Sequence, residues 1–327
     1  MVQIDKVKLD KADRLILAEL DKNCRIPMNK LAKISRKSRQ SVEYRIKRLV
    51  EAGVITSFNA AINPHRMGFK LYKIYLQLRN VPKERDRLFA YLRTSGIVYW
   101  MGVCDGAWDL IFGVFAKSDK EFFALKNEMI SGFGSIIVRN YYDALLDVKQ
   151  YLKMYFTNGI SEPVMFGGEV VANDMDALDH AILGEIVNDA RIALTKLASK
   201  AGSNPATVAA RLKRMEKLGI IIQYRIGVDL DKLGLEQYKA ILHIERYTKE
   251  DEKKLLEYLS NVPNIQYFIR NIWDIEPELV VEDYHGYREI IEKLREEFPF
   301  VIKSTESVLM KTDEWTPGYR NLLGKSG

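Results

Sequence analysis

The sequence predicts an α+β protein in which one order of helices and strands occurs twice. Apolar residues at the start of each half recur every three or four positions, which is the spacing of amphipathic helices. The pattern then changes to a two-residue alternation, which is typical of strands. The chain also matches itself at a shift of 166 residues, without a gap, over almost seventy residues. We therefore expect a tandem duplication, with copy one starting near Asp10 and copy two near Asp176.

The aligned positions include acidic, basic and glycine residues as well as apolar ones. Identity at this many positions in one register is not expected by chance. The pairs are Asp10/Asp176, Asp13/Asp179, Arg25/Arg191, Val42/Val208, Arg45/Arg211, Lys47/Lys213, Arg48/Arg214, Gly53/Gly219 and Lys73/Lys239.

Each copy opens with three predicted helical segments. In copy one they run from Asp10 to about Asn23, from Pro27 to about Ile34, and along Ser38–Ile55. A short helix, a tight turn and a basic third helix form the helix-turn-helix pattern. Copy two has Gly202 in the turn, whereas copy one has Arg36, a residue for which the turn conformation costs strain.

The third segment of copy one is predicted to be a capped, basic helix. Ser38 suits its N-cap and Gly53 the position past its end, while Val42, Ile46 and Leu49 form one inward-facing stripe. Residues 30–48 carry eight basic side chains and one acid, which is more than a merely solvated face requires. We therefore predict DNA contacts, because basic side chains release counterions from phosphates and outward-facing side chains reach base edges. The predicted contacts are Lys37, Ser38, Arg39, Gln40, Ser41, Tyr44, Arg45, Lys47 and Arg48.

Copy two carries a weaker version of this face. Asn204 suits the N-cap and Pro205 the first helical position. Ala206 and Ala210 replace Gln40 and Tyr44, and alanine can touch a thymine methyl but cannot hydrogen-bond a base. We predict two unlike half-sites, with a dimerising remnant that does not bind DNA as the alternative for copy two. Its predicted DNA contacts are Asn204, Thr207, Arg211, Lys213 and Arg214.

After each helical unit the sequence predicts the order β-α-β-β-α-β, the ferredoxin-like split unit. The first strand of copy one should be half-buried, because Tyr72, Ile74, Leu76 and Leu78 alternate with more polar residues. The predicted domains are two helix-turn-helix units (1–62 and 175–228), two ferredoxin-like units (63–147 and 229–315), a partly ordered linker (148–174) and a tail (316–327).

Composition and charge limit the function. No run of eighteen apolar residues and no signal-peptide pattern occurs, so we expect a cytoplasmic protein with no membrane partner. The two cysteines and four histidines lie at no metal-binding spacing, so no metal, cofactor or catalytic residue is predicted. Residues 1–60 carry fourteen Lys/Arg against seven Asp/Glu, whereas residues 235–315 carry eleven against eighteen, which places any polyanion near the start of the chain.

The ordered motifs resemble the Lrp/AsnC (feast/famine) family of transcription regulators, whose sheet unit is called the RAM domain. They are Leu9–Asp13, Leu31-Ala32, Val42, Arg45–Leu49, Glu51–Ile55 and Gly106–Asp109. Members of this family carry one such unit and pair through their sheet domains, so the tandem chain resembles a fused pair. The resemblance implies face-to-face pairing of the two sheet domains within the chain, double-stranded DNA as partner, and further assembly into homo-oligomers.

The resemblance also implies a site for a small effector, such as an amino acid, at the turn that contains Gly106, Trp108 and Asp109. A hairpin glycine is the purely structural alternative at this turn. Copy two has Asn271-Ile-Trp-Asp274 followed by Glu276-Pro277, which predicts that the strand is broken there and that any effector binds asymmetrically.

Two other functions remain as alternatives. The first is a sirohaem decarboxylase, because these enzymes have a similar two-domain architecture. This function would need a histidine near the second strand, and Ile97–Val103 contains none. A subunit that only modulates other regulators of the family would not need the basic surplus of residues 30–48.

Overall fold

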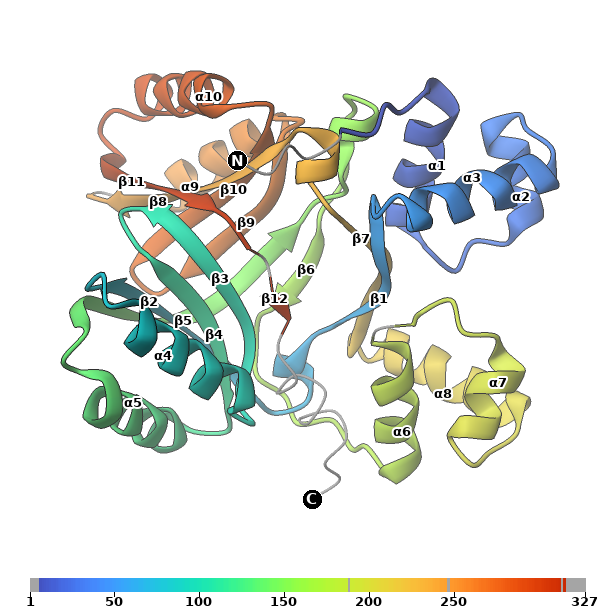
Figure 1. The fold of residues 1–327 in the computed structure, drawn as a ribbon, viewed down its shortest axis with the longest axis horizontal. Helices are drawn as coiled ribbons and strands as arrows, with labels where there is room; N and C mark the ends of the chain where they lie inside the picture. The colour runs from blue at the N-terminus through green and yellow to red at the C-terminus, as the bar shows by residue number, and fades with distance from the viewer. Residues whose placement is uncertain (1–5, 188, 246–247, 313, 316–327) are drawn as a thin grey trace.

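The computed structural model describes residues 6–187, 189–245, 248–312 and 314–315. Two groups of three helices lie on one side of the molecule and a body of strands and helices lies on the other (Figure 1). We name the groups head one and head two. Head one contains α1 (Lys11–Lys22), α2 (Met28–Ser35) and α3 (Arg39–Glu51); head two contains α6 (Ala177–Ile186), α7 (Leu194–Lys200) and α8 (Pro205–Lys217).

The helix ends follow the predicted capping residues. The side chain of Ser38 accepts a hydrogen bond from the N–H of Ser41, and Asn204 caps α8 in the same way through Thr207. The turn between α2 and α3 places Arg36 at φ 52°, and Gly202 has φ 66° at the equivalent place. Copy one therefore holds a non-glycine residue in the left-handed region, as the alignment predicted.

A two-stranded ribbon connects the heads. Strand β1 (Ile55–Ile62) follows head one, β7 (Ile221–Val228) follows head two, and they pair antiparallel with Phe58 opposite Ile226. Each strand is followed by a short 3-10 helix, η1 (Pro64–Arg66) or η3 (Asp231–Leu233).

The body confirms the predicted β-α-β-β-α-β order in both copies. Copy one contributes β2 (Lys70–Leu78), α4 (Pro82–Thr94), β3 (Val98–Gly106), β4 (Leu110–Ala116), α5 (Asp119–Phe133) and β5 (Ile137–Gln150). Copy two contributes β8 (Glu236–Ile244), α9 (Lys249–Ser260), β9 (Ile265–Asn271), β10 (Asp274–Val281), α10 (Tyr284–Glu297), β11 (Ile302–Met310) and the short β12 (Glu314–Trp315).

The two sheets join into one closed ring. The strand order is β11-β8-β10-β9-β5-β2-β4-β3, and β3 returns to β11. The seams are β5–β9 and β3–β11, each between one strand of copy one and one strand of copy two. The inner faces of the two sheets lie against each other, and the helices lie outside (Figure 1). The edge-to-edge seams were not predicted from the sequence.

Two predictions about strands are wrong. Strand β2 is not half-buried: Lys73 is only 4% exposed and Tyr75 is fully buried, because the second sheet covers the inner face of the first. Strand β10 is not broken at Glu276-Pro277. It runs through both residues, with Pro277 opposite Phe268 of β9.

A buried ionic cluster lies between the two sheets. Lys73 Nζ is 2.5 Å from Glu276 Oε2, and Lys239 Nζ is 2.8 Å from the same oxygen and 2.5 Å from Glu278 Oε1. The hydroxyl of Tyr75 also donates to Glu276. Burial alone would raise the pKa of Glu276, but the attraction of the two lysines lowers it to about 2. The cluster therefore connects copy one to copy two through buried ion pairs.

The predicted linker contains ordered structure. The 3-10 helix η2 (Met154–Phe156) follows β5, and β6 (Val164–Gly167) pairs antiparallel with β5. The predicted tail, 316–327, lies outside the described residues. None of the helices in the described part of the chain is long and apolar enough to cross a membrane.

Candidate DNA interface

The residues that α3 exposes are decided by the residues that it buries on the opposite side. Val42, Ile46 and Leu49 pack into head one, as their spacing predicted. Their burial turns Gln40, Tyr44 and Lys47 outward, and Tyr44 is 68% exposed. The outward side of α3 therefore presents an amide, a phenol ring and an ammonium group to the solvent.

Two arginines of α3 are held by carboxylates of α1. Arg45 Nη1 lies 2.7 Å from Asp13 Oδ1 and 2.8 Å from Asp10 Oδ2, and Arg48 Nη2 lies 2.5 Å from Asp13 Oδ2. Asp13 is only 1% exposed, so its charge is compensated by these two guanidinium groups. The hydrogen bond from the backbone N–H of Asp13 lowers the pKa of Asp10, and the guanidinium of Arg45 lowers it further. This arrangement, which we call the Asp–Arg clamp, fixes the angle of α3 on α1.

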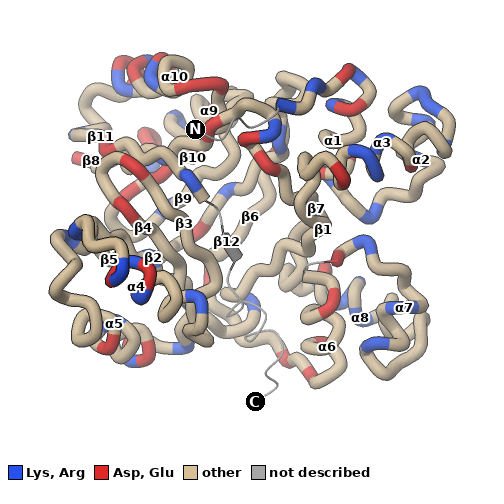
Figure 2. Tube along the Cα trace, viewed as in Figure 1, with Lys and Arg blue, Asp and Glu red and all other residues tan. Residues whose placement is uncertain are grey.

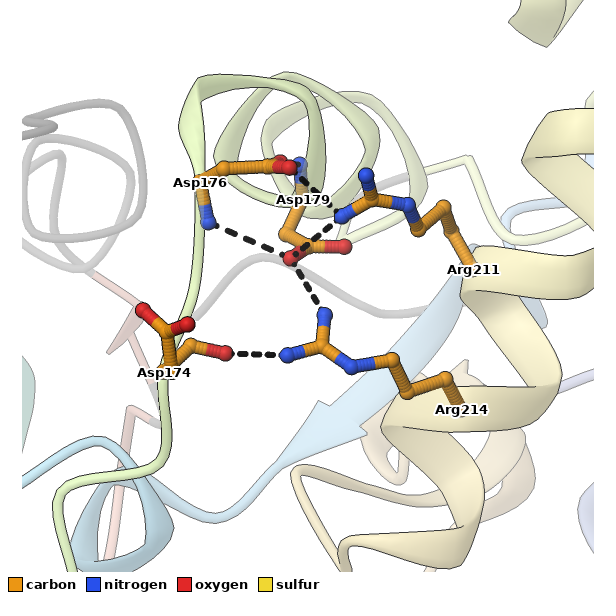
Figure 3. A pocket seen from close by; sticks show the side chains of 5 residues that line it. All are labelled: Asp174, Asp176, Asp179, Arg211 and Arg214. Carbon is orange, nitrogen blue, oxygen red and sulfur yellow. Dashed lines mark hydrogen bonds and ion pairs between the residues drawn. The ribbon is translucent and has the colours of Figure 1, made fainter.

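Head two contains the same clamp. Arg211 Nη1 lies 2.7 Å from Asp176 and 3.1 Å from Asp179, and Arg214 Nη1 lies 2.7 Å from Asp179 (Figure 3). Arg214 also donates to the backbone oxygen of Asp174. These five residues line a cavity of about 290 Å³, in which the charges of Asp176, Asp179, Arg211 and Arg214 are paired with one another.

The basic residues of α3 and α8 alone do not indicate the carboxylates of the clamp. The duplication does indicate them, because both aspartates and both arginines of the clamp occur in each copy at the 166-residue shift. The structure therefore gives Arg45, Arg48, Arg211 and Arg214 intramolecular partners in addition to their predicted DNA contacts.

The other predicted DNA residues lie around the starts of α3 and α8. In head one, Lys37, Ser38 and Arg39 are exposed, and Ser41 is half-buried. Arg39 forms an exposed ion pair with Glu43 at 2.7 Å, which contributes little to stability. In head two, Asn204 and Lys213 are exposed and Thr207 is half-buried. Figure 2 shows basic residues on the helices of both heads.

The residues of the predicted effector turn lie at the β3–β11 seam. Gly106 has φ 118°, and a Cβ there would lie 2.5 Å from the backbone oxygen of Ser307. The seam itself therefore requires this glycine. Its neighbour Trp108 is buried, donates from Nε1 to Glu306 at 2.8 Å, and has the guanidinium of Arg139 3.9 Å from its ring centroid.

Asp109 has different partners. It accepts a hydrogen bond from the N–H of Leu78 at 2.8 Å and lies 3.6 Å from Arg85. The turn thus brings Gly106, Trp108 and Asp109 together in the chain, but Trp108 and Asp109 point to separate protein groups.

Comparison with known proteins identifies the family. Residues 9–56 match the winged helix-turn-helix DNA-binding family, and residues 175–216 match the AsnC-type helix-turn-helix domain. The proline dehydrogenase transcriptional activator of Rhodobacter capsulatus is 30% identical over 143 residues, which are 42% of this chain and 91% of that protein. The chain belongs to the Lrp/AsnC family of transcription regulators.

Other likenesses agree with this Lrp/AsnC assignment. The transcriptional regulator AzlB of Bacillus subtilis is 29% identical over 145 residues, which are 43% of this chain and 92% of that protein. Each relative thus corresponds to less than half of this Lrp/AsnC chain, as a duplicated unit requires. The two helix-turn-helix matches fall on α1–α3 and on α6–α8, so the chain carries two helix-turn-helix domains.

A solved structure resembles the whole Lrp/AsnC chain. The crystal structure of the siroheme decarboxylase NirDL superposes with a TM-score of 0.64 at 9% sequence identity, and covers 96% of this chain and 97% of its own. At this identity the likeness shows a shared fold only. Strands β3 and β9 contain no histidine, and His243, on β8, lies 2.8 Å from Asp274.

Proposed function

We propose that this protein regulates transcription by binding double-stranded DNA with both heads at once. Helices α3 and α8 would enter the major groove at two places on one face of the duplex, about 34 Å or a multiple of it apart. The outer face of α3 carries the proposal. It exposes Gln40, Tyr44 and Lys47, while the Asp–Arg clamp and the buried stripe hold the helix in place.

The proposed roles in head one follow from side-chain chemistry. Gln40 can form two hydrogen bonds with adenine, and Tyr44 can contact a base edge or a thymine methyl. Lys37, Arg39 and Lys47 would bind phosphates, and their charge would make affinity fall steeply with salt. Arg45 and Arg48 would act mainly through the clamp, with the exposed side of Arg48 available to a phosphate.

Head two would recognise a different half-site. Ala206 and Ala210 stand where head one has Gln40 and Tyr44, and both are exposed. Thr207 and Asn204 supply the polar groups near the start of α8, and Lys213 supplies a free charge for a phosphate. The operator would then be asymmetric, because the two heads present different chemistry to the groove.

A small effector, such as an amino acid, would bind beside Gly106, Trp108 and Asp109. The polar groups at this seam include Arg139 and Glu306, which suit a ligand that carries both a carboxylate and an amine. Titration calorimetry with the standard amino acids tests this part. Heat with one of them that is lost in Trp108→Ala supports it, and no heat with any of them rules it out.

Footprinting on a bound duplex tests the main proposal. Hydroxyl-radical cleavage should show two protected patches on one face of the DNA, and log affinity should fall linearly with log salt. Protection of one patch alone would refute simultaneous binding by both heads. A visible spectrum of the purified protein tests the enzyme alternative, since a Soret band would favour a tetrapyrrole-binding protein.

A further inference from the structure

The two heads contact each other through one arginine from each. Arg25 follows α1 and donates from Nη1 to the backbone oxygen of Ala190 in head two at 2.6 Å. Arg191 occupies the equivalent place after α6 and donates from Nη1 to the backbone oxygen of Cys24 in head one at 2.5 Å. Because Cys24 and Ala190 are themselves equivalent positions, one contact is made twice in opposite directions.

Each arginine also lies over an aromatic ring of the ribbon. The guanidinium of Arg25 is 5.4 Å from the ring centroid of Tyr224 on β7, and that of Arg191 is 5.5 Å from the centroid of Phe58 on β1. Such cation–π contacts add to the charge-assisted hydrogen bonds. The hydroxyl of Tyr224 donates to Glu216 of α8 at 2.7 Å, which extends the connection to the second recognition helix.

The backbone completes the connection. The N–H of Cys24 donates to the oxygen of Tyr224 at 2.9 Å, and the N–H of Ala190 donates to the oxygen of Phe58 at 2.8 Å. Head one is thus bonded to the strand of copy two, and head two to the strand of copy one. Cys24 and Ala190 are both fully buried, so this junction is packed as well as hydrogen-bonded.

We propose that Arg25 and Arg191 are positioning residues that set the distance and angle between the heads, and thereby the half-site spacing that the protein accepts. The inference rests on the proposed function, in which both heads bind one duplex. Each inserted base pair moves the second half-site by about 3.4 Å and rotates it by about a tenth of a turn. Heads fixed by this junction tolerate one spacing only, whereas heads joined only by the ribbon and body would tolerate several.

The test compares spacing dependence in three full-length variants. The probes are the duplex that wild-type protein enriches from random DNA, the same duplex with five base pairs inserted between the half-sites, and a duplex with the head-one half-site alone. The variants are the double substitution Arg25→Ala with Arg191→Ala, the double substitution of both arginines by lysine, and Arg14→Ala. Arg14 is an exposed arginine of α1 and serves as the matched control.

For wild type and Arg14→Ala we expect the insertion to weaken binding at least tenfold. In the double alanine variant, which keeps the ribbon and the backbone hydrogen bonds of the junction, the insertion should weaken binding at least threefold less than it does in wild type, with single half-site affinity within twofold of wild type. The lysine variant keeps a charged donor and should recover part of the spacing dependence, which also distinguishes the effect from misfolding.

Other outcomes overturn the inference. A double alanine variant that keeps the tenfold penalty shows that the ribbon and body set the spacing. Equal loss of affinity on the single half-site shows that the arginines contact DNA or support one head. Wild-type protein that binds the duplex without spacing dependence refutes this inference alone, whereas wild-type protein that binds no duplex refutes the proposed function itself.

Discussion

Replacing Glu276 by glutamine tests the ionic cluster that joins the two sheets. The substitution leaves Lys73 and Lys239 buried with only Glu278 as an acidic partner in the cluster. Breaking a buried ion pair by removing one partner costs about 3–5 kcal/mol. The attraction of the two lysines also lowers the pKa of Glu276 from 4.5 to about 2, so the ionised carboxylate is the form that the folded protein stabilises. We therefore expect Glu276→Gln to lower the free energy of unfolding by about 3–5 kcal/mol at pH 7.

The pH dependence follows from the direction of the pKa shift. Because the folded pKa of Glu276 lies below its unfolded value, the stabilisation is fully present above the unfolded value of 4.5. It is lost progressively as the pH falls from there towards 2. The free energy of unfolding of wild type should therefore fall more steeply through this range than that of Glu276→Gln.

Urea unfolding followed by circular dichroism, from pH 7 down to pH 3, measures both effects. The control is Glu84→Gln on α4, because Glu84 pairs with Arg87 at 2.7 Å on the surface and such pairs contribute about 0–1 kcal/mol. Glu276→Gln with wild-type stability at pH 7, or with the same slope below pH 5, would refute the assignment of a stabilising role to the cluster.

Three further predictions concern the heads and the seam. Asp13→Asn should destabilise the protein by about 1–3 kcal/mol and weaken DNA binding, because Arg45 and Arg48 lose their shared anion; unchanged thermal unfolding and affinity would contradict the clamp. Gln40→Ala with Tyr44→Ala should cost about 1–3 kcal/mol of binding at the head-one half-site and nothing at the other half-site, measured by fluorescence anisotropy. Gly106→Ala should destabilise the protein by about 1–3 kcal/mol, because Gly106 has φ 118° and its new Cβ would meet the backbone of Ser307. Gly96→Ala is its control, since nothing lies within 4 Å of a Cβ there, and equal stability of the two variants would contradict the prediction.

Local features of the fold were predictable because local residues decide them. The side chains of Ser38 and Asn204 suit the N-cap of a helix, where they accept a backbone hydrogen bond. Gly202 suits a left-handed turn because it has no side chain. The alignment of the two copies extends each prediction to the equivalent residue of the other copy. It predicted a left-handed conformation for Arg36, because Arg36 aligns with Gly202.

Pairing between the copies was not predictable in the same way. The inward face of β2 resembles a solvent face in sequence, because Lys73 alternates with apolar residues. The burial of Lys73 depends on Glu276, which belongs to copy two. Within copy one, the residue opposite Lys73 on β4 is Gly113 and not an acid, so copy one alone does not predict an ion pair at this place. The ribbon and the two seams also join strands far apart in the chain, and alternation alone does not specify a strand's partner.

The claim that two unlike heads bind one duplex is tested most directly by DNA selection. Wild-type protein and the full-length double variant Ala206→Gln with Ala210→Tyr would be used in parallel to enrich duplexes from random DNA. The variant copies the outward residues of α3 onto α8. We predict that wild type enriches two unlike half-sites at one spacing, and that the variant moves towards two similar half-sites. A perfect palindrome enriched by wild type, or an identical asymmetric sequence enriched by both proteins, would contradict the account.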